Sequence, residues 1–492
     1  MNQNTLIMAD SRRASSRYTQ KMQRTVDNQK NIITFLLSII IAFGSMYLLK
    51  DSSFTTPQSY VLFLLFFSVL LWVTEAIPPF AVGLFIIGFL LFTLGNPSVN
   101  SPESADYIDY TIFINTWSDS VIWLLLGGFF LAEGMKKSKL DVELFRIAVG
   151  GFGAKPKYVL LGLMGATAIG SMVMSNTATT AMMIASVSPP LLKLNEGNKF
   201  HKALLVGIPA AASIGGMGTI IGSPPNAIAV DAINNSDLFD FNIGFLEWMI
   251  VGIPIALSLT LLTWFLLTKL FPAEQQNLDL SFIKPKEELS EEELWEKEDL
   301  KSKKNIVLGV LTITILLWLT GKVHGIPPAL VSGIPILVFT MLSIITSDDV
   351  RSLPWDTLML VAGGLSLGLA IQKTGLAAYF VTQLADFQMS FWAISLLFGI
   401  LTVVFSNIMS NTATATILIP IAGLLGTQSP IVVPLIIGLS ASCALLFPIS
   451  TPPNAIAYST GKLQQKDFRS NGLLIGILGP LLITIWILLI HG

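Results

Sequence analysis

Apolar residues run through this chain in blocks long enough to cross a lipid bilayer, separated by short polar segments. A helix needs about 20 mostly apolar residues to span the hydrocarbon core. Two apolar stretches, 158–192 and 390–426, are interrupted by polar residues and predict helical hairpins that enter and leave on one side. The other apolar blocks predict eleven spans, at 31–49, 59–76, 78–95, 117–135, 203–230, 244–271, 305–321, 327–346, 357–372, 430–457 and 473–490. Two of these spans contain a break, 203–230 at Gly222 and 430–457 at Ser450.

The polar interruptions occur twice. The hexamer SNTATT at 175–180 returns as SNTATA at 410–415, and the octamer GSPPNAIA at 222–229 returns as STPPNAIA at 450–457. Scattered Ser, Thr and Asn can also join membrane helices to one another, but this does not explain two motifs that recur in the same order. Polar turns inside apolar sequence are costly in lipid unless they line a cavity. The four clusters therefore predict a binding site.

Weaker matches extend the duplication, and the charges indicate its topology. Trp72 precedes a Pro-Pro pair and Trp318 precedes another. With a cytoplasmic N-terminus, all but three of the 29 Lys and Arg residues (Lys50, Lys322 and Lys373) lie on the cytoplasmic side, as positive charge does in membrane proteins. The span at 59–76 then runs inward and its partner at 305–321 runs outward. The two repeats are predicted to be inverted.

The predicted fold is an all-α polytopic membrane protein with two inverted repeats, about 11 transmembrane helices and two re-entrant helical hairpins. The expected location is the plasma (inner) membrane, with the N-terminus cytoplasmic and the C-terminus external. Residues 140–157 mix charged and apolar positions and predict a helix along the interface. The predicted parts are a cytoplasmic tail at 1–30, a first half at 31–272 that has an extra first span and a hairpin at about 158–192, a cytoplasmic charged linker at 273–304, and a second repeat at 305–492 with a hairpin at about 390–426.

Composition agrees with a membrane protein and argues against an enzyme. The chain is 52% hydrophobic and 12% charged, whereas soluble domains carry roughly 25% charged residues. A single cysteine, Cys443, excludes disulfides within the chain, and the three histidines are isolated from other metal-ligand residues. No nucleophile–base pair or metal triad is visible at membrane depth. We expect neither an enzyme nor a nucleic-acid partner.

The clusters combine groups that bind anions with groups that bind cations. Backbone N–H groups at a helix start carry partial positive charge and bind carboxylate or phosphate. Proline frees backbone carbonyls one turn earlier, and these carbonyls with Ser and Asn oxygens suit a small cation. No Lys or Arg lies in the four clusters, so a bound dianion needs co-bound cations, of which sodium fits best. Glu75 and Glu133 lie near span ends, where anchoring is favoured over proton coupling.

At these residues the sequence resembles the divalent-anion/sodium symporter family, whose members carry paired Ser-Asn-Thr signatures on two hairpin tips. The resemblance covers about residues 31–492. It implies a homodimer with a scaffold domain and a moving transport domain, working by an elevator motion. It also implies that the substrate is held by Ser175, Asn176, Thr177, Ser410, Asn411 and Thr412, with Ser223, Pro224, Thr451 and Pro452 alongside.

Two sodium sites follow from the same resemblance. It implies a first site of Ser171, Ser175, Asn176 and Gly222, and a second site of Ser406, Ser410, Asn411 and the carbonyl of Ser450. Relatives can have Thr at the position of Ser406 and Ala at that of Ser450, and both differences keep a usable oxygen.

The residues and the resemblance together predict a carrier of C4-type dicarboxylates such as succinate, malate, fumarate or 2-oxoglutarate, coupled to sodium by symport. Dicarboxylate exchange (antiport) is the first alternative, and a citrate or sulfate carrier is a further one. An anion channel would instead show currents far above carrier turnover and no acceleration by counter-substrate. The expected partners are a small dicarboxylate anion, sodium, the lipid bilayer and a second copy of the chain, with no cofactor besides Na⁺.

Overall fold

The computed structural model describes most of the chain as helix. The described residues are 29–97, 107–143, 153–194, 199–235, 242–273, 291–376, 379, 390–423 and 431–491, and no strand occurs among them. Most of the predicted tail at 1–30 and much of the predicted interfacial helix at 140–157 lie outside these residues.

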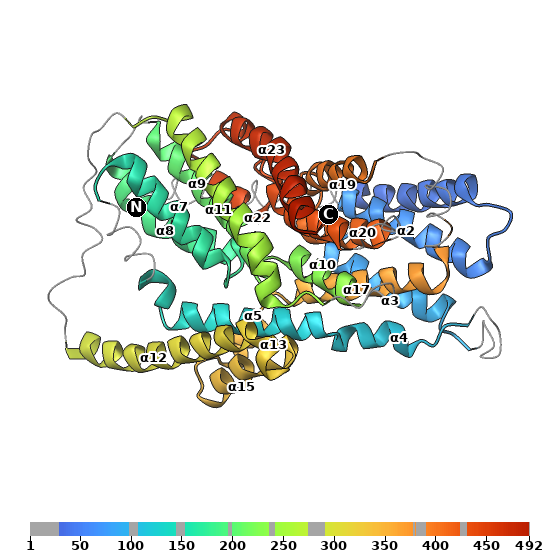
Figure 1. The fold of residues 1–492 in the computed structure, drawn as a ribbon, viewed down its shortest axis with the longest axis horizontal. Coiled ribbons are helices and arrows are strands. Elements are labelled where there is room, and N and C mark those ends of the chain that lie inside the picture. The colour runs from blue at the N-terminus through green and yellow to red at the C-terminus, as the bar shows by residue number, and fades with distance from the viewer. Residues whose placement is uncertain are drawn as a thin grey trace, which may run out of the picture.

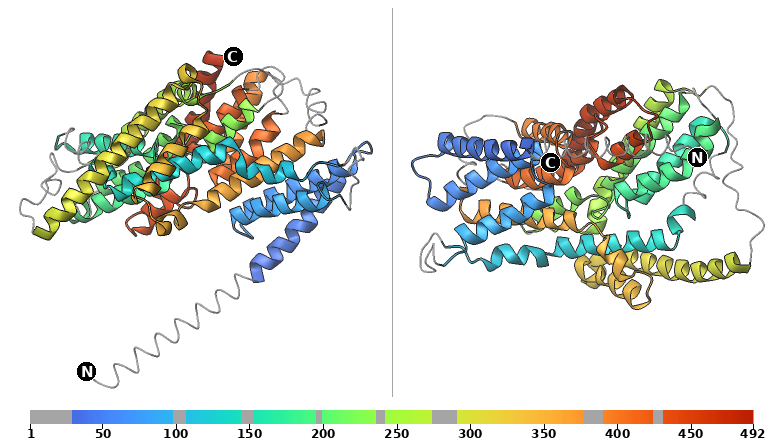
Figure 2. Two further views of the ribbon diagram at one scale, coloured as in Figure 1. Left: turned by 90° about the horizontal axis from the view of Figure 1, so that it is seen from below. Right: turned by 180° about the vertical axis from the view of Figure 1, so that it is seen from behind.

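The first half carries helices on both sides of each polar interruption. A helix at Gln29–Leu49 comes first and lies at the edge of the molecule, largely unburied (Figure 2). It is followed by α2 (Thr56–Thr74), α3 (Pro79–Thr93), α4 (Thr111–Ile114), η1 (Asn115–Ser118), α5 (Ser120–Lys137), α7 (Pro156–Ser171), α8 (Asn176–Leu194), α9 (Phe200–Gly215), η2 (Gly216–Gly218), α10 (Pro224–Asn234) and α11 (Phe245–Leu270).

The second half repeats this order. Its elements are α12 (Glu291–Leu319), α13 (Gly321–His324), α14 (Pro328–Val331), α15 (Gly333–Met341), α16 (Ser347–Arg351), α17 (Trp355–Lys373), α19 (Phe391–Ser406), α20 (Asn411–Gly423), α21 (Val432–Ser440), η4 (Ala441–Cys443), α22 (Pro452–Ser459) and α23 (Gln465–His491). The helix α12 begins at Glu291, so the last part of the predicted linker at 273–304 is helical and continues into the candidate span Leu300–Leu319.

Eight helices of the described chain are long and apolar enough to cross a membrane. They overlap eight of the eleven predicted spans, although the span predicted at 203–230 consists of the helix Phe200–Gly218 and, after a break, α10. The other three predicted spans correspond to shorter pieces: α3, the pair α14 and α15, and the sequence α21–η4–α22. Prolines explain the short pieces, because Pro79 and Pro328 begin their helices and Pro452 begins α22 after a break.

The helices pack in two groups (Figure 1). The frame group consists of α2–α5 and α12–α17, with α17 packed on α3 and α15 on α5. The hairpin group consists of α7–α11 and α19–α23, with α9 packed between α7 and α11, and α19 packed on α21 and α23. Contacts between the groups run mainly through α10 and α20, which touch α5 and α17. Each group draws helices from both halves of the chain.

Close backbone contacts join the halves within the frame group. A Cβ on Gly363 in α17 would overlap the backbone of Gly83 in α3. Lys137 at the end of α5 pairs with Asp349 in α16 at 2.6 Å. The frame group is therefore a single packed body rather than two repeats side by side.

The repeated tryptophan confirms that local geometry recurs in the two halves. The Trp72 indole N–H donates to the carbonyl of Pro79 at 3.2 Å, and that of Trp318 donates to Pro328 at 3.1 Å. In each half this hydrogen bond fixes the turn between two consecutive helices.

Candidate functional site

Both hairpins break at the same place and restart with the same cap. The first breaks between α7 and α8, where the Ser175 hydroxyl accepts the Ala178 N–H at 3.2 Å. The second breaks between α19 and α20, where the Ser410 hydroxyl accepts the Ala413 N–H at 3.1 Å. A serine at this position satisfies one backbone N–H of the first helical turn. Each Ser-Asn-Thr signature is thus the N-terminus of a helix.

The cap leaves other N–H groups of the first turn without an intrahelical acceptor. In α8 these belong to Asn176 and Thr177, and in α20 to Asn411 and Thr412. Helices of 19 and 13 residues carry a full dipole, so both tips attract an anion. Thr177 is exposed, whereas the other three residues are half-buried.

The octamer motifs form a second pair of matched features. Asn226 donates through Nδ2 to the carbonyls of Gly216 at 2.8 Å and Thr219 at 2.7 Å. In the other half, Asn454 donates through Nδ2 to the carbonyl of Phe447 at 3.0 Å. Buried backbone carbonyls need a hydrogen-bond donor. Each asparagine supplies one to the non-helical segment that precedes its own helix, and so fixes the position of that segment.

The residues at the start of these helices differ between the halves. Pro224 begins α10 and Pro452 begins α22. The Thr451 hydroxyl caps α22 by accepting the N–H of Asn454 at 3.3 Å, whereas the Ser223 side chain makes no cap hydrogen bond. Pro452 is exposed and Pro224 half-buried.

Oxygen atoms gather around the side chain of Asn176. In one orientation of its amide, Oδ1 accepts the Ser171 hydroxyl at 2.5 Å. In the other, Nδ2 lies 2.5 Å from Ser171 Oγ, 3.1 Å from the carbonyl oxygen of Ala212 and 3.2 Å from that of Gly222. One amide atom is thus surrounded by three oxygens. Hard cations prefer oxygen ligands. A cation bound here would therefore select the amide orientation in which Oδ1 of Asn176 is the fourth oxygen.

The residues of the second predicted sodium site are arranged differently from those around Asn176. Ser406 Oγ and Asn411 Oδ1 are buried and have no hydrogen-bond partner among the described residues. Ser450 joins the set through Asn407, whose Oδ1 accepts the Ser450 hydroxyl at 2.8 Å. Buried oxygens without donors are costly in a protein interior. A cation is a partner that would satisfy both.

The two halves interleave at the site. The tip helix α20 packs on α10 of the first half, and the tip helix α8 packs on α22 of the second (Figure 1). Each hairpin tip therefore adjoins the Pro-Pro-Asn helix of the other repeat. The printed side-chain contacts pair the clusters within each half, Asn176 with Gly222 and Asn407 with Ser450, and the two helix contacts link one half to the other.

The two acids considered from the sequence are engaged elsewhere. Glu75 ends α2 with a left-handed backbone (φ 50°) and is exposed. Glu133 pairs with Lys136 at 3.1 Å. Both geometries agree with anchoring at a helix end.

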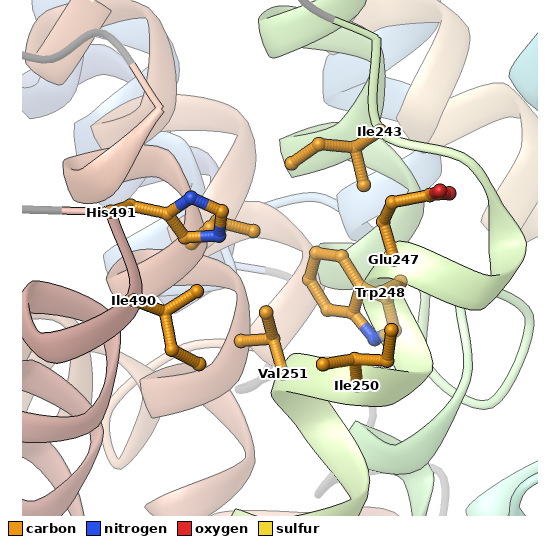
Figure 3. Close-up of a pocket in the computed structure, with 8 residues that line it drawn as sticks. Ile243, Glu247, Trp248, Ile250, Val251, Ile490 and His491 are labelled. Atoms are coloured by element: carbon orange, nitrogen blue, oxygen red, sulfur yellow. The ribbon is translucent and has the colours of Figure 1, made fainter.

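A separate cavity of about 190 Å³ lies between α11, α21 and α23. Figure 3 shows Ile490 and His491 facing Trp248 and Val251 across it, with the Glu247 carboxylate turned away. Glu247 pairs instead with Lys322 of α13, an ion pair that joins the two groups. Apolar side chains dominate this lining, so it does not suit a small dianion.

Sequence reasoning missed four side chains that shape the site. Asn226 and Asn454 lie inside the repeated octamers, so the repeat itself was a signal for them. Asn407 has no counterpart, because the matching position in the first half is Met172. Trp248 donates its indole N–H to the carbonyl of Met217 at 2.9 Å, from a helix outside the motifs.

Comparison with known proteins identifies the family of the chain. Residues 69–429 match the citrate transporter family. The sodium-dependent dicarboxylate transporter SdcS of Staphylococcus aureus (strain USA300) is 30% identical over 488 residues, which cover 92% of this chain and 90% of that protein. The protein of the same name from Staphylococcus saprophyticus is 29% identical over 517 residues, covering 98% and 96%.

Solved structures show the same fold at much lower identity. The Alcanivorax borkumensis YdaH transporter aligns with a TM-score of 0.52 at 16% identity, over 84% of this chain and 98% of that chain. Neisseria gonorrhoeae MtrF aligns with a TM-score of 0.51 at 13% identity, over 85% and 96%. With the family match across most of the chain and the relatives along nearly its whole length, the chain belongs to the divalent-anion/sodium symporter family of citrate and dicarboxylate transporters.

Proposed function

We propose that the protein is a secondary active transporter that moves a C4-type dicarboxylate together with sodium. The observation that carries the proposal is the oxygen cluster around Asn176, which adjoins an anion-binding helix start. Ser171 and the Gly222 carbonyl lie on one side of this side chain, and the cap of α8 lies on the other. One residue thus contacts both candidate ligands.

The side-chain amide of Asn176 couples the binding of sodium to the binding of the dicarboxylate. When Oδ1 of Asn176 binds a cation, its Nδ2 points away from Ser171 and is available to a carboxylate. Without the cation, the reversed orientation directs Nδ2 to Ser171 Oγ and to two carbonyls, which removes that donor. Sodium therefore favours substrate binding through orientation as well as through charge.

A substrate with two acidic groups fits a site with two hairpin tips, one tip for each acidic group. Each tip offers the N–H groups of a helix start, and Ser175 and Ser410 orient these by identical caps. No Lys or Arg lies in the four clusters, so bound cations supply the opposite charge. The two sodium sites we propose are Ser171, Ser175, Asn176 and Gly222, and Ser406, Ser410, Asn411 and the carbonyl of Ser450.

The relatives support this substrate class. SdcS is named a sodium-dependent dicarboxylate transporter, which supports sodium symport of succinate, malate, fumarate or 2-oxoglutarate. The family match, described as a citrate transporter, makes citrate the second candidate substrate. Exchange of one dicarboxylate for another is the alternative mode of coupling.

For the mechanism we propose an elevator motion in an inverted-repeat homodimer, in which the hairpin group slides against the frame group. The separate packing of the two groups supports this division. The burial of the two Pro-Pro-Asn helices supports an inward-open state. The helix α10 is buried almost throughout, whereas α22 exposes Pro452, Ala455 and Tyr458. In the predicted topology α22 leads to the cytoplasm.

Uptake of radiolabelled succinate into proteoliposomes tests the function. Empty and malate-loaded vesicles are compared, each with and without an inward sodium gradient. Symport predicts uptake into empty vesicles that vanishes when choline replaces sodium. Uptake only into loaded vesicles would establish exchange. No succinate uptake under any condition would reject the dicarboxylate proposal, and citrate would be the next substrate tested.

A further inference from the structure

Asn407 makes three hydrogen bonds at the break of the second hairpin. It follows Ser406 directly, at the end of α19. Its Nδ2 donates to the Val403 carbonyl at 2.8 Å, which fixes the amide against its own helix. Its Oδ1 accepts the Leu446 N–H at 3.0 Å and the Ser450 hydroxyl at 2.8 Å. One side chain thus ties α19 to the non-helical segment 444–451.

These bonds decide which oxygen of Ser450 is available. The Ser450 hydroxyl donates to Asn407 and also accepts the Phe447 N–H at 3.0 Å. Both roles of the hydroxyl are therefore used. Among the described hydrogen bonds, none ends on the Ser450 carbonyl, because Pro452 and Pro453 follow it and lack N–H groups. The carbonyl is the oxygen left for a cation.

The first half closes its break by other means. Met172 stands at the position that matches Asn407, and its backbone carbonyl accepts the Thr219 hydroxyl. The same hydroxyl accepts the Gly222 N–H at 3.0 Å. In the first half a side chain on the broken segment reaches the hairpin, whereas in the second half a side chain on the hairpin reaches the broken segment.

Two further oxygens belong to Ser406, which precedes Asn407, and to Asn411, which begins α20 after the break. Ser406 Oγ and Asn411 Oδ1 are buried and lack hydrogen-bond partners among the described residues. Asn407 itself cannot join them as a ligand, because two donors already occupy its Oδ1. Its bonds to Leu446 and Ser450 hold the segment that carries the third oxygen, the Ser450 carbonyl.

We propose that Asn407 is the positioning residue of the second cation site: it fixes segment 444–451 so that the Ser450 carbonyl, Ser406 and Asn411 bind one Na⁺. This inference rests on the proposed function. Asn407 lies outside the repeated motifs. In this proposal it raises the affinity for sodium although it contacts neither sodium nor the substrate. The first site needs no such residue, because Thr219 does the equivalent work there.

The test compares Asn407→Leu with Asn407→Asp. Leucine removes all three hydrogen bonds, so we expect the sodium concentration for half-maximal succinate uptake to rise about tenfold or more. Aspartate keeps both acceptor bonds, while its second oxygen replaces the donor to the Val403 carbonyl and adds a negative charge near the proposed cation site. The sodium concentration that it needs should therefore rise by no more than about threefold over the wild type. The KM for succinate at saturating sodium should change little in either variant.

A matched control separates positioning from stability. Asn234 also holds backbone with its amide, accepting the Ile243 N–H at 2.8 Å and donating to the Ile243 carbonyl at 3.1 Å, but it lies far along α10 from the break. Asn234→Leu should lower the Tm without moving the sodium dependence. The sodium-induced rise in Tm of detergent-purified protein, against choline, gives a readout that needs no transport.

A wild-type sodium dependence in Asn407→Leu, by uptake and by Tm, would overturn this inference alone. The proposed function would stand in that case. Absence of any sodium effect in the wild-type protein would overturn both. If Asn407→Leu does not fold, a tenfold weaker sodium response in Asn407→Asp, which keeps the bonds to Leu446 and Ser450, would count against the proposal.

Discussion

Ala227 and Ala455 hold the same place in the two copies of the Pro-Pro-Asn-Ala-Ile-Ala motif, yet Ala227 is completely buried and Ala455 is exposed. The difference comes from their neighbours. The helix α10 is enclosed by α5, α17, α20 and α21, whereas α22 packs only against α8 and α9 among the larger contacts. This broken symmetry is the basis for the inward-open state that we propose.

This difference predicts unequal cysteine reactivity. Cys443 is the only cysteine and is buried, so Cys443→Ala gives a background without a reactive thiol. In that background Ala455→Cys should react with a membrane-impermeant maleimide in inside-out vesicles at least tenfold faster than Ala227→Cys. Succinate uptake by the unlabelled variants controls for folding. Equal labelling, or labelling of Ala455→Cys only from outside, would contradict the inward-open state.

Removal of the Ser406 hydroxyl should affect sodium but not folding. This hydroxyl is buried and has no partner among the described residues, so Ser406→Ala breaks no protein hydrogen bond. In sodium-free buffer we expect the Tm to change little, while the sodium-induced rise in Tm is lost and the sodium needed for half-maximal uptake rises about tenfold. Thermal unfolding with sodium and with choline measures both effects.

Ser395 supplies the control for that experiment. It lies in the same helix, α19, and its hydroxyl is likewise buried without a described partner. Ser395→Ala should leave the sodium response unchanged. Loss of the response in both variants would indicate a general effect on α19 rather than a cation site.

The Lys137–Asp349 pair should make the stability of the frame group depend on pH. Burial raises the pKa of Asp349, but hydrogen bonds from Lys137 and Thr346 outweigh it and lower the pKa from 3.8 to about 2. A lowered pKa in the folded protein stabilises above about pH 4, and this stabilisation disappears as the pH falls toward 2. Asp349→Asn should therefore cost roughly 1 kcal/mol at pH 7, since the pair is partly exposed.

The measurement is the Tm of both proteins in detergent between pH 3 and pH 7. The gap between wild type and Asp349→Asn should be largest at neutral pH and narrow as the pH approaches 3. A gap that is constant over this range would show that the carboxylate charge contributes nothing.

Gly363 should tolerate no side chain. A Cβ there would overlap the backbone of Gly83, and backbone cannot move aside as a flexible side chain can. Gly363→Ala should destabilise the protein by about 1–3 kcal/mol or more. Gly309→Ala is the control, because nothing lies within 4 Å of a Cβ at that position in α12. This second change should be neutral or stabilising by up to ~1 kcal/mol. Equal Tm values for the two variants would refute the close packing.

Much of the site was predictable because its signals are local. Ser175 and Ser410 cap helices where their motifs begin, and Pro224 and Pro452 start helices because their ring geometry suits the first turn. The spans followed in the same way from apolar length. Three predicted spans consist of shorter helices than expected, namely α3, the pair α14 and α15, and the sequence α21–η4–α22.

What could not be predicted depends on contacts between distant segments. Nothing in the sequence near Asn407 indicates that its amide reaches Leu446 and Ser450, since the first half has Met172 at that position. The unequal burial of Ala227 and Ala455 is likewise invisible in two identical motifs. Both result from how α10 and α22 pack after the halves come together.

The contact between Gly83 and Gly363 has a consequence for synthesis. These residues belong to one packed surface, but the ribosome produces them about 15–60 s apart at ~5–20 residues per second. Until α17 emerges, α3 lies in the bilayer with its glycine face uncovered, and the insertion machinery or lipid must cover it. The frame group is therefore completed late, after the whole first hairpin has been synthesised. Until then the nascent chain contains the first Ser-Asn-Thr and Pro-Pro-Asn motifs but only part of the frame group.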